Sequence, residues 1–355
     1  MAITPRLKSG ISYWRSGAAL YIGDRFNCYL LPESIGERTF LETLRRLEAN
    51  TLEKIDQPLI AALSRLNLID RKITEIPYQY RADNFALSSI DGTRSLALQQ
   101  FLERFEIEAE SVSHRPGNID GGRTQIISRK TYPISIHAIG TSNYRIAVNL
   151  YANLKASGFE SCQMQLIGEV EIGELMGTQL LKTDLSSNRA EVLKRIDRDA
   201  SLYPEAIPEI PQVKFAVSIG TPNPELQQTW LQNNISYLII NATSNSVRVG
   251  PVVKPGVTAC ANCLSLTEIA SGHLPESGKY FRQAPVREPS AALSLLGTAL
   301  ASLAVAQIID TGTSELLGKS LRFTSGSLVA PEITNWELQP ACGCIHIAST
   351  RATSL

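Results

Sequence analysis

Residues 249–263 read Val-Gly-Pro-Val-Val-Lys-Pro-Gly-Val-Thr-Ala-Cys-Ala-Asn-Cys and end in the pair Cys260-x-x-Cys263. A second pair, Cys342-x-Cys344, follows later in the chain. Thiolates two or three positions apart can reach one metal ion from a single turn, and two such turns complete a tetrahedral shell. The pattern therefore predicts a Cys₄ site for Zn²⁺. Because such a shell has no open coordination position, the predicted zinc is structural rather than catalytic.

Disulfide bonds are the alternative interpretation of these cysteines. Cys342 and Cys344 are too close in sequence to bond each other comfortably, and nothing at the N-terminus resembles a secretion signal. Both points favour zinc in a cytoplasmic protein. The remaining cysteines, Cys28 and Cys162, lie in apolar stretches and are predicted to be buried thiols.

The composition is that of a soluble globular protein. Lysine plus arginine and aspartate plus glutamate number 34 each, so the chain lacks the basic surplus that nucleic-acid binding uses. The apolar stretch Leu293–Ile309 is interrupted by Ser, Thr, Gly and Gln, which favours a buried helix over a membrane span. At 355 residues the chain is long enough for two or three domains.

Residues 1–80 are predicted to form a separate module. Its strand-like runs, separated by Ser-Gly and Gly-Asp turns, are Ile11–Trp14, Ala19–Ile22 and Phe26–Leu31. Apolar residues at helix spacing follow over 35–49 and 57–66, with a short helix between them. Three strands before three helices indicate a winged-helix module. DNA binding is disfavoured, because Gln57–Leu63 has no arginine or lysine to meet phosphates.

Residues 81–132 are predicted to connect this module to the rest of the chain. One helix is expected near Thr93–Phe105, and the polar, glycine-rich stretch 113–123 is expected to be a mobile loop.

From residue 133 to 355 the pattern changes to alternating strands and helices. The predicted strands are Ile134–Ile139, Cys162–Ile167, Val213–Ile219 and Tyr237–Asn241. The predicted helices are Ile146–Lys155, Arg189–Ile196, Leu226–Asn233 and Ala291–Ile309. This alternation indicates a doubly wound α/β domain with a mostly parallel sheet.

The stretch 249–263 closely resembles the zinc-loop signature of ThiF-like, ubiquitin-activating-enzyme-like proteins, above all their relatives in ribosomal-peptide natural-product biosynthesis. In that branch the second cysteine pair also follows a tryptophan, as in Trp336 and Pro340-Ala341-Cys342-Gly343-Cys344. Gly158-Phe159 and the segment 170–192 keep the outline of the family's second strand and crossing segment. The resemblance spans residues 134–345.

The chain departs from this family where the family binds ATP. The family's GxGGxG turn, whose backbone amides approach the phosphates, is here Gly140-Thr141-Ser142-Asn143-Tyr144-Arg145. Side chains at Ser142, Asn143 and Arg145 would occupy the space that the phosphates need.

Further departures concern the family's other nucleotide contacts. Its two aspartates for ribose and magnesium fall on Leu166 and Gly168, its γ-phosphate contacts on Glu174 and Gly177, and its crossing-helix lysine on Arg189. We therefore expect no ATP in this chain. Arg145 and Arg189 could still meet an anion, but surface salt bridges are the favoured expectation for both.

A winged-helix module ahead of such a domain resembles the precursor-recognition subunit of azole- and azoline-forming cyclodehydratases. The resemblance implies that a leader peptide adds as a strand beside the third strand and lies against the third helix. The residues implied for peptide binding are Phe26, Asn27, Cys28, Tyr29, Leu30, Leu59, Ile60 and Leu63. It also implies a YcaO-type partner, which uses ATP to close Cys, Ser or Thr side chains into five-membered rings. A homodimer is a further arrangement that the resemblance allows for this chain.

Two alternatives from other classes stay open. The first is an active peptide-adenylating enzyme of the microcin C type, which joins a similar module to the same fold. The second is a purely structural zinc scaffold without a peptide ligand. A catalytic residue is not predicted: His137 is expected to be a satisfied core residue, and Cys162 an inert strand thiol.

Overall fold

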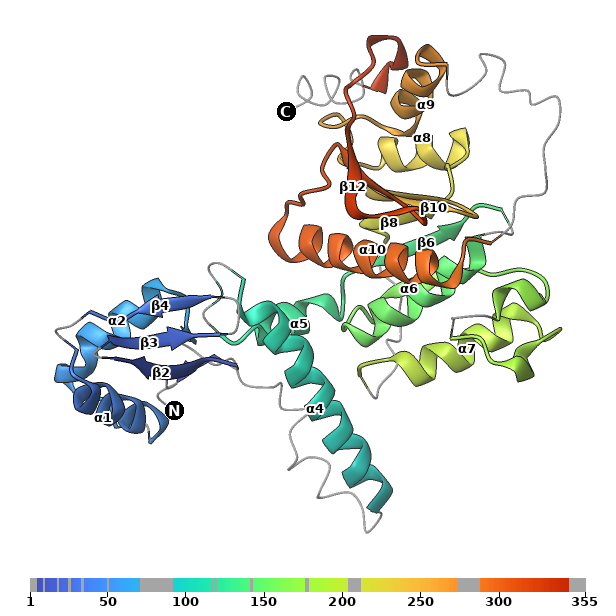
Figure 1. Cartoon of the computed structure of the whole chain (residues 1–355). Coiled ribbons are helices and arrows are strands. Elements are labelled where there is room, and N and C mark those ends of the chain that lie inside the picture. The colour runs from blue at the N-terminus through green and yellow to red at the C-terminus, as the bar shows by residue number, and fades with distance from the viewer. Residues whose placement is uncertain are drawn as a thin grey trace. The chain divides into compact units, whose positions relative to one another are not determined.

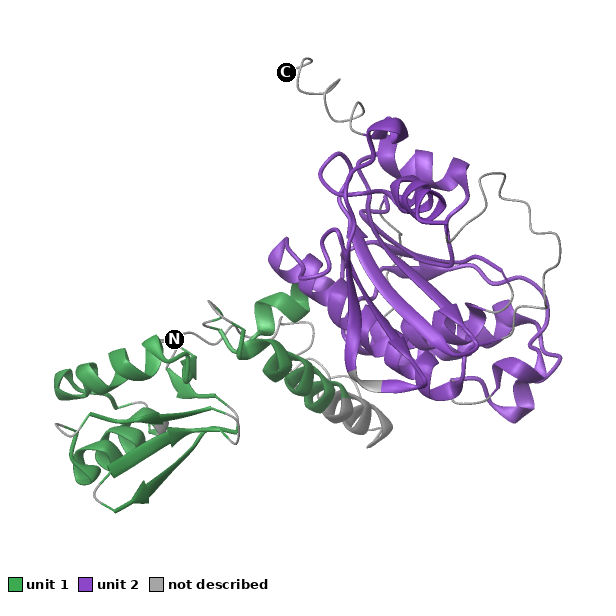
Figure 2. Ribbon diagram, turned by 45° about the horizontal axis from the view of Figure 1, so that its top comes forward, with its two compact units in different colours: residues 1–128 green, residues 129–355 purple. Residues whose placement is uncertain are grey.

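The protein divides into two compact units, residues 1–128 and 129–355 (Figure 2). The structure, a computed structural model, describes residues 5–70, 92–140, 143–175, 179–203, 212–272 and 288–344, apart from 9, 18, 25–26, 33–34, 50, 116–117 and 119. Each unit is built around its own apolar core.

The first unit begins with a three-stranded antiparallel sheet in the order β2-β3-β4 (Figure 1). Its strands are β2 (Ser12–Ser16), β3 (Ala19–Gly23) and β4 (Cys28–Leu30), and its helices are α1 (Glu37–Glu48), the 3₁₀ turn η1 (Lys54–Asp56) and α2 (Gln57–Arg65). A separate pair, β1 (Arg6–Leu7) and β5 (Ile69–Asp70), is antiparallel. These elements lie within a few residues of the predicted ones; the winged-helix assignment stays a prediction.

The core of this module lies between one face of the sheet and the two helices. Ile22, Phe40 and Leu63 are fully buried in it. The turn between the helices is fixed by Asp56, whose carboxylate accepts hydrogen bonds from Thr43 (2.6 Å) and from two nitrogens of Arg46 (2.5 and 2.8 Å). This network sets the direction in which α2 leaves the turn.

The connecting segment carries a longer helix than the sequence indicates. Helix α4 runs Gly92–Ser113 rather than 93–105, because apolar residues at helix spacing continue to Val112, which is buried. Helix α5 (Arg123–Arg129) follows. Before it, the side-chain oxygen of buried Asn118 accepts hydrogen bonds from the backbone of Asp120 and Gly122. The mobility of this loop stays a prediction.

The second unit is an α/β domain around a seven-stranded sheet in the order β12-β11-β10-β9-β8-β6-β7. The strands are β6 (Ile134–Ala138), β7 (Cys162–Met164), β8 (Phe215–Ile219), β9 (Ser236–Thr243), β10 (Ser246–Val253), β11 (Lys319–Thr324) and β12 (Ser327–Asn335). The strands β7, β6, β8 and β9 are parallel neighbours, which confirms the doubly wound arrangement for this half of the sheet.

The other half of the sheet is antiparallel, which corrects the expectation of a mostly parallel sheet. Strand β10 turns back on β9, and β11 and β12 follow as a hairpin. The zinc-loop signature that starts at Val249 does not reveal this strand, although its first residues lie inside β10. Gly250 sits at an irregularity of this strand with φ +98°, where a Cβ would lie 2.4 Å from the carbonyl oxygen of Lys319. Only glycine fits there.

Helices cover both faces of this sheet (Figure 1). The helices on one face are α6 (Tyr144–Ala156), α7 (Arg189–Ala200) and α10 (Ala291–Thr311). Those on the other face are α8 (Pro224–Gln232) and α9 (Ala261–Ala270). The unit also contains three short 3₁₀ turns, η4 (Ile172–Glu174), η5 (Lys182–Asp184) and η6 (Pro340–Cys342). The predicted helices are thus confirmed, with ends shifted by a few residues.

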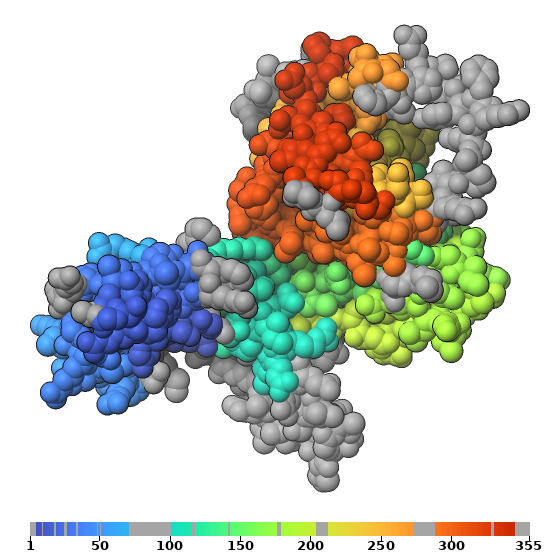
Figure 3. All heavy atoms as spheres, viewed as in Figure 1, coloured from blue at the N-terminus to red at the C-terminus, as the bar shows by residue number. Residues whose placement is uncertain are grey.

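Helix α10 passes a length and composition test for a membrane span, with a mean hydropathy of 1.9, but half of that stretch is buried in the unit. Its atoms, orange in Figure 3, lie at the surface along its other side. Leu293 and Val305 face the core, whereas Leu295 and Leu303 are exposed. The packing of α10 against α6 and β10 is that of a core helix with one open side.

Candidate functional site

Four cysteine side chains converge where α9 begins and the C-terminal segment returns. Cys260 is the residue before the first turn of α9, Cys263 lies in that turn, Cys342 ends η6, and Cys344 lies two residues further on. The four Sγ atoms all lie within 4.8 Å of one another. Separations of 3.8, 3.4 and 3.5 Å join Cys260 to Cys263, Cys260 to Cys342, and Cys263 to Cys344. The two predicted pairs are therefore brought together.

This geometry fits a tetrahedral metal and not a disulfide. Zinc–sulfur bonds of about 2.3 Å place the sulfurs of a tetrahedral shell about 3.8 Å apart, whereas a disulfide needs about 2.05 Å. All four thiols are free. Burial raises the pKa of Cys260 to about 12, so that a cation is needed to hold its thiolate at neutral pH. The cluster is thus compatible with zinc through donor type, spacing and burial.

Polar groups around the cluster donate hydrogen bonds to the sulfurs. The side-chain amide of Asn262 donates to Cys342 (3.1 Å) and that of Gln227 to Cys260 (3.2 Å), while the backbone N–H of Gln339 lies 3.5 Å from Cys263. Such donors stabilise thiolates and orient metal ligands. A metal held here would join the segment after β12 to the start of α9 and leave no coordination position for a substrate.

A second group of polar residues lies at the N-terminus of α6, where this class of fold can receive an anion. The carboxylate of Glu288 accepts a hydrogen bond from the backbone N–H of Arg145 (3.3 Å). The Arg145 side chain is buried and donates to the carbonyl oxygens of Pro289 (2.6 Å) and Gly173. Buried Asn143 donates to the carbonyl oxygen of Ile139. Ser142, the third predicted obstruction, lies outside the described residues.

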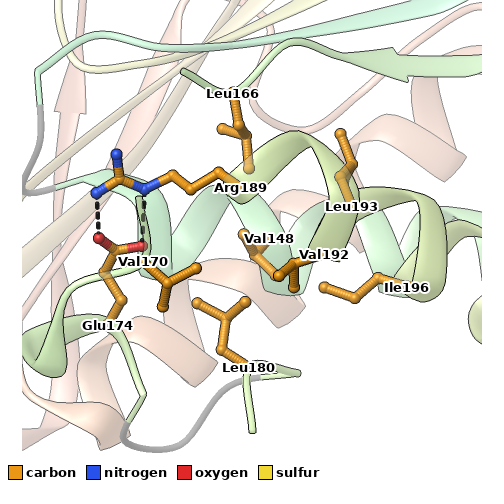
Figure 4. A pocket seen from close by; sticks show the side chains of 9 residues that line it. All are labelled: Val148, Leu166, Val170, Glu174, Leu180, Arg189, Val192, Leu193 and Ile196. Carbon is orange, nitrogen blue, oxygen red and sulfur yellow. Dashed lines mark hydrogen bonds and ion pairs between the residues drawn. The ribbon is translucent and has the colours of Figure 1, made fainter. Parts of the chain in front are cut away.

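A buried ion pair lies at the start of α7 and forms the third group of polar residues in this unit. Arg189 donates two hydrogen bonds to the Glu174 carboxylate, from Nε (3.2 Å) and from Nη2 (2.5 Å), as Figure 4 shows. The two side chains are only 6% and 3% exposed. The expectation of surface salt bridges for Arg145 and Arg189 is therefore wrong, because the crossing segment folds over both guanidinium groups.

The pocket beside this ion pair is narrow, and most of the side chains that line it are apolar. Its other lining residues are Val148, Leu166, Val170, Leu180, Val192, Leu193 and Ile196 (Figure 4). It is too narrow to admit a water molecule. Gly168 has φ +84°, and a Cβ there would lie 2.9 Å from Nη1 of Arg189, so any side chain at this position would strain the backbone and require the arginine to shift. Gly177 lies outside the described residues.

Glu288 gives this site a pH dependence that can be measured. Burial raises its pKa to about 7, although hydrogen bonding by Arg145 opposes the shift. An acid with a higher pKa in the folded state stabilises the protein below its unfolded pKa and loses that contribution as pH rises through its folded value. The wild-type protein should therefore lose about 1 kcal/mol of unfolding free energy between pH 5 and pH 8. The loss is this small because the Glu288 side chain is partly exposed and solvent screens its charge.

Denaturant unfolding at a series of pH values checks this. Glu288→Gln keeps an oxygen for the Arg145 amide and should flatten the decline. The matched control is Glu315→Gln, since Glu315 is exposed. If Glu288→Gln and Glu315→Gln show the same slope as the wild type, the carboxyl group of Glu288 does not titrate in this range.

The residues predicted for peptide binding divide between the edge strand and the core of the first unit. Leu59 and Leu63 are 4% and 0% exposed and belong to the core, whereas Ile60 is half-buried. Asn27, Cys28 and Leu30 are exposed, Tyr29 packs partly on the core, and Phe26 lies outside the described residues.

The prediction of a buried thiol is wrong for Cys28, which is exposed, because β4 is an edge strand and Cys28 faces away from the core. It is confirmed for Cys162. Burial raises the pKa of the Cys162 thiol to about 12, as expected of an inert group. His137 is hydrogen-bonded as expected but only partly buried: its ring packs 5.2 Å from that of Trp230, and its Nε2 lies 3.0 Å from the Ser135 hydroxyl.

Sequence reasoning missed the part that Glu288 plays. It lies far in sequence from the turn that it caps, and no motif connects it to α6. The resemblance puts Glu174 at a phosphate-contacting position, but only the fold brings its carboxylate beside Arg189.

The order of the strands and the helices on both faces of the sheet define an α/β fold that this chain shares with several solved proteins. Among solved structures, the microcin C7 biosynthetic enzyme MccB in complex with N-formylated MccA matches 96% of this chain over 99% of its own, with 14% identity and a TM-score of 0.63. E. coli MccB with ATP also covers 96% of this chain and 99% of its own, with 15% identity and a TM-score of 0.60. PaaA covers 93% of this chain and 100% of its own, with 13% identity and a TM-score of 0.59. At these identities the likeness establishes the fold. No family model matches the chain, and no curated protein matches its sequence.

Proposed function

We propose that this chain is a cytoplasmic, non-catalytic subunit that binds the leader segment of a ribosomal precursor peptide. It would present that peptide to a YcaO-type cyclodehydratase and activate it. The partner would use ATP to convert Cys, Ser or Thr residues of the peptide into azolines. The proposal includes a homodimer as one arrangement of the chain.

One observation carries the non-catalytic part of this proposal: the protein's own carboxylates fill the positions suited to an anion. Glu288 lies at the N-terminus of α6, and Glu174 neutralises Arg189. A nucleotide would have to displace two carboxylates and open a cleft too narrow for water. Helix N-termini and arginines attract phosphates only when they are free to do so.

The peptide-binding part rests on the free edge of β4. This strand is short and uncharged, and within the described part of the chain it pairs with β3 and leaves its other edge without a strand partner. An extended peptide can add to such an edge through backbone hydrogen bonds and place alternate side chains towards Tyr29 and Ile60. MccB, which shares the fold, has been solved in complex with MccA. We propose that the present chain likewise receives a peptide.

The zinc site is proposed to maintain the fold. When bound, Zn²⁺ would supply four strong bonds to thiolates from two distant segments. The residues Asn262, Gln227 and Gln339 would keep these thiolates oriented. No step of peptide binding requires the metal itself.

Protection of Cys28 tests the peptide site. Among the described cysteines, Cys28 is the exposed one, so a maleimide should label it selectively in the zinc-loaded protein. A saturating synthetic leader, taken from a short Cys-, Ser- and Thr-rich open reading frame beside the gene, should slow this labelling at least tenfold. In a separate measurement, the same leader carrying a fluorophore should bind the unlabelled protein with a dissociation constant in the micromolar range or below, as followed by fluorescence anisotropy.

A control variant guards this experiment against indirect effects. Ile60→Asp should abolish both protection and anisotropy change, whereas Ile55→Asp should preserve them, because Ile55 is already 67% exposed. Equal labelling rates with and without leader, together with no binding below high micromolar, would favour the structural-scaffold alternative.

ATP–pyrophosphate exchange separates the proposal from a microcin C type adenylating enzyme. We expect no exchange above background from the purified chain with its peptide, because Glu174 and Glu288 occupy the anion positions. The measurement uses labelled pyrophosphate, Mg²⁺ and saturating peptide. Peptide-dependent exchange would sink the non-catalytic assignment and support the adenylating enzyme.

A further inference from the structure

A row of large side chains crosses the open face of the three-stranded sheet in the first unit. Trp14 pairs with Tyr21 in register, and Tyr21 pairs with Leu30. The rings of Trp14 and Tyr21 stack with centroids 5.9 Å apart and an angle of 10° between their planes. Leu30 is 61% exposed and Trp14 39%. In Figure 3 the dark-blue atoms of this part of the chain lie at the surface of the unit.

This row lies opposite the core of the module. Ile22, the neighbour of Tyr21 in β3, is fully buried and pairs with Tyr29, which packs on the core. Successive side chains of a strand point to opposite faces. Tyr21 and Leu30 therefore share the outer face, although large apolar residues on a solvent-facing sheet are unusual without a binding role.

The backbone of β4 directs the same residue, Leu30, towards the free edge. The N–H of Leu31 donates to the carbonyl of Leu20, and the carbonyl of Asn27 accepts from Asp24, both at 2.9 Å. In an antiparallel ladder such bonded positions alternate. The odd-numbered positions 27, 29 and 31 therefore face β3, and the N–H and C=O groups of Cys28 and Leu30 face the edge where an added strand would pair.

An added strand would then meet Leu30 twice, through its backbone and through its side chain. The peptide residue opposite Leu30 would form a hydrogen-bonded pair with it and project on the same face, with Cα atoms about 5.5 Å apart. A long or aromatic side chain there could also reach Tyr21, one strand further on. Trp14 would hold Tyr21 in place by stacking.

We propose that the peptide bound at β4 is read on both faces, and that its outward-facing residue next to Leu30 is a large apolar one. This inference rests on the proposed function and narrows its ligand class. The peptide would carry at least three consecutive apolar residues, the middle one packing on Leu30 and Tyr21 and its neighbours facing Tyr29 and Ile60. A leader with alternating polar and apolar residues would bind less tightly.

The opposite edge of the sheet is a poorer site for the same peptide. Strand β2 carries Arg15 in an ion pair with Glu37 of α1 (3.0 Å), and a serine stands at each end of the strand. Charged and polar side chains on an edge strand discourage pairing. The uncharged β4 edge is therefore the one to which the aromatic row belongs.

Peptide display on the full-length zinc-loaded protein tests the inference. Twelve-residue peptides are selected from a random phage library, and the best binder is synthesised with leucine or serine at its outward position. For the leucine peptide, Leu30→Ser should weaken binding about tenfold by fluorescence anisotropy, and Trp14→Ala about two- to threefold. For the serine peptide, Leu30→Ser should change binding less than twofold. Leu295→Ser, on the exposed side of α10, is the matched control and should change neither.

N-methylation of the peptide backbone separates this inference from the proposed function. A methyl group on the outward residue removes its hydrogen bond to the β4 edge and should abolish binding. If binding survives N-methylation, or no peptide is selected, the peptide does not add to β4 and both proposals fall. If N-methylation abolishes binding but Leu30→Ser weakens the leucine and serine peptides equally, the edge site stands and reading on the outer face is wrong.

Discussion

Cys344→Ser should yield insoluble or unfolded protein rather than a folded, inactive one. A structural zinc contributes on the order of 10–16 kcal/mol of apparent folding free energy, which is comparable to the whole stability of a typical domain. Cys344 is buried, and its sulfur lies 3.5 Å from that of Cys263. Without it, the last turn would lose its attachment to α9, and three thiols, two of them buried, would remain without a complete shell.

Metal analysis and thermal unfolding check this expectation. The wild-type protein should contain one zinc per chain and lose both zinc and cooperative unfolding when treated with a strong chelator. Cys28→Ser is the matched control, because Cys28 is exposed and lies in the other unit; it should keep zinc content and melting temperature. A well-folded Cys344→Ser variant with unchanged metal content would contradict the assignment.

A milder variant keeps the test informative if the cysteine variants cannot be purified. Asn262 donates a hydrogen bond to the Cys342 sulfur (3.1 Å) and is otherwise exposed. Loss of such a contact weakens metal affinity about 10- to 100-fold in known sites. Asn262→Ala should therefore fold and bind zinc, but a competing chelator should remove its zinc at a lower chelator concentration than the wild type requires.

The sequence was most informative where chemistry is local. The spacing of the cysteines around residues 260 and 342 predicted which side chains would meet, since two short turns leave little choice. Helices with strong apolar spacing, such as α6 and α10, were also predictable. By contrast, the hairpin of β11 and β12 was missed, because most of its described side chains are partly or fully exposed and its apolar run Leu328–Ala330 stops at Pro331.

What could not be predicted was the pairing of residues distant in sequence. Arg189 appeared as a surface residue in the sequence, because nothing near it marks burial. In the fold, η4 carries Glu174 across the start of α7 and closes over the arginine. A carboxylate at an aligned phosphate-binding position is informative only once its cationic partner is known to be beside it.

Breaking the ion pair between Glu174 and Arg189 should have the second-largest effect on the stability of the protein, after loss of the cysteine cluster. Glu174→Ala leaves the guanidinium of Arg189 buried without its bidentate partner, and removing one member of a buried ion pair costs about 3–5 kcal/mol. The matched control is Glu171→Ala: Glu171 lies 3.9 Å from the same arginine but is 71% exposed. Its loss should change the unfolding free energy by less than about 0.5 kcal/mol in denaturant unfolding.

The same variant tests whether Glu174 stands in for a bound anion. With its carboxylate gone, phosphate should bind beside Arg189 and raise the melting temperature of Glu174→Ala, relative to chloride at equal ionic strength. The wild type and Glu171→Ala should show no such difference. A phosphate effect of equal size in all three proteins would place the anion elsewhere, and an unchanged stability of Glu174→Ala would show that the pair does not hold the crossing segment. The expected pattern would explain why ATP is absent from the proposed function: the protein neutralises its own anion site, and two carboxylates keep it closed.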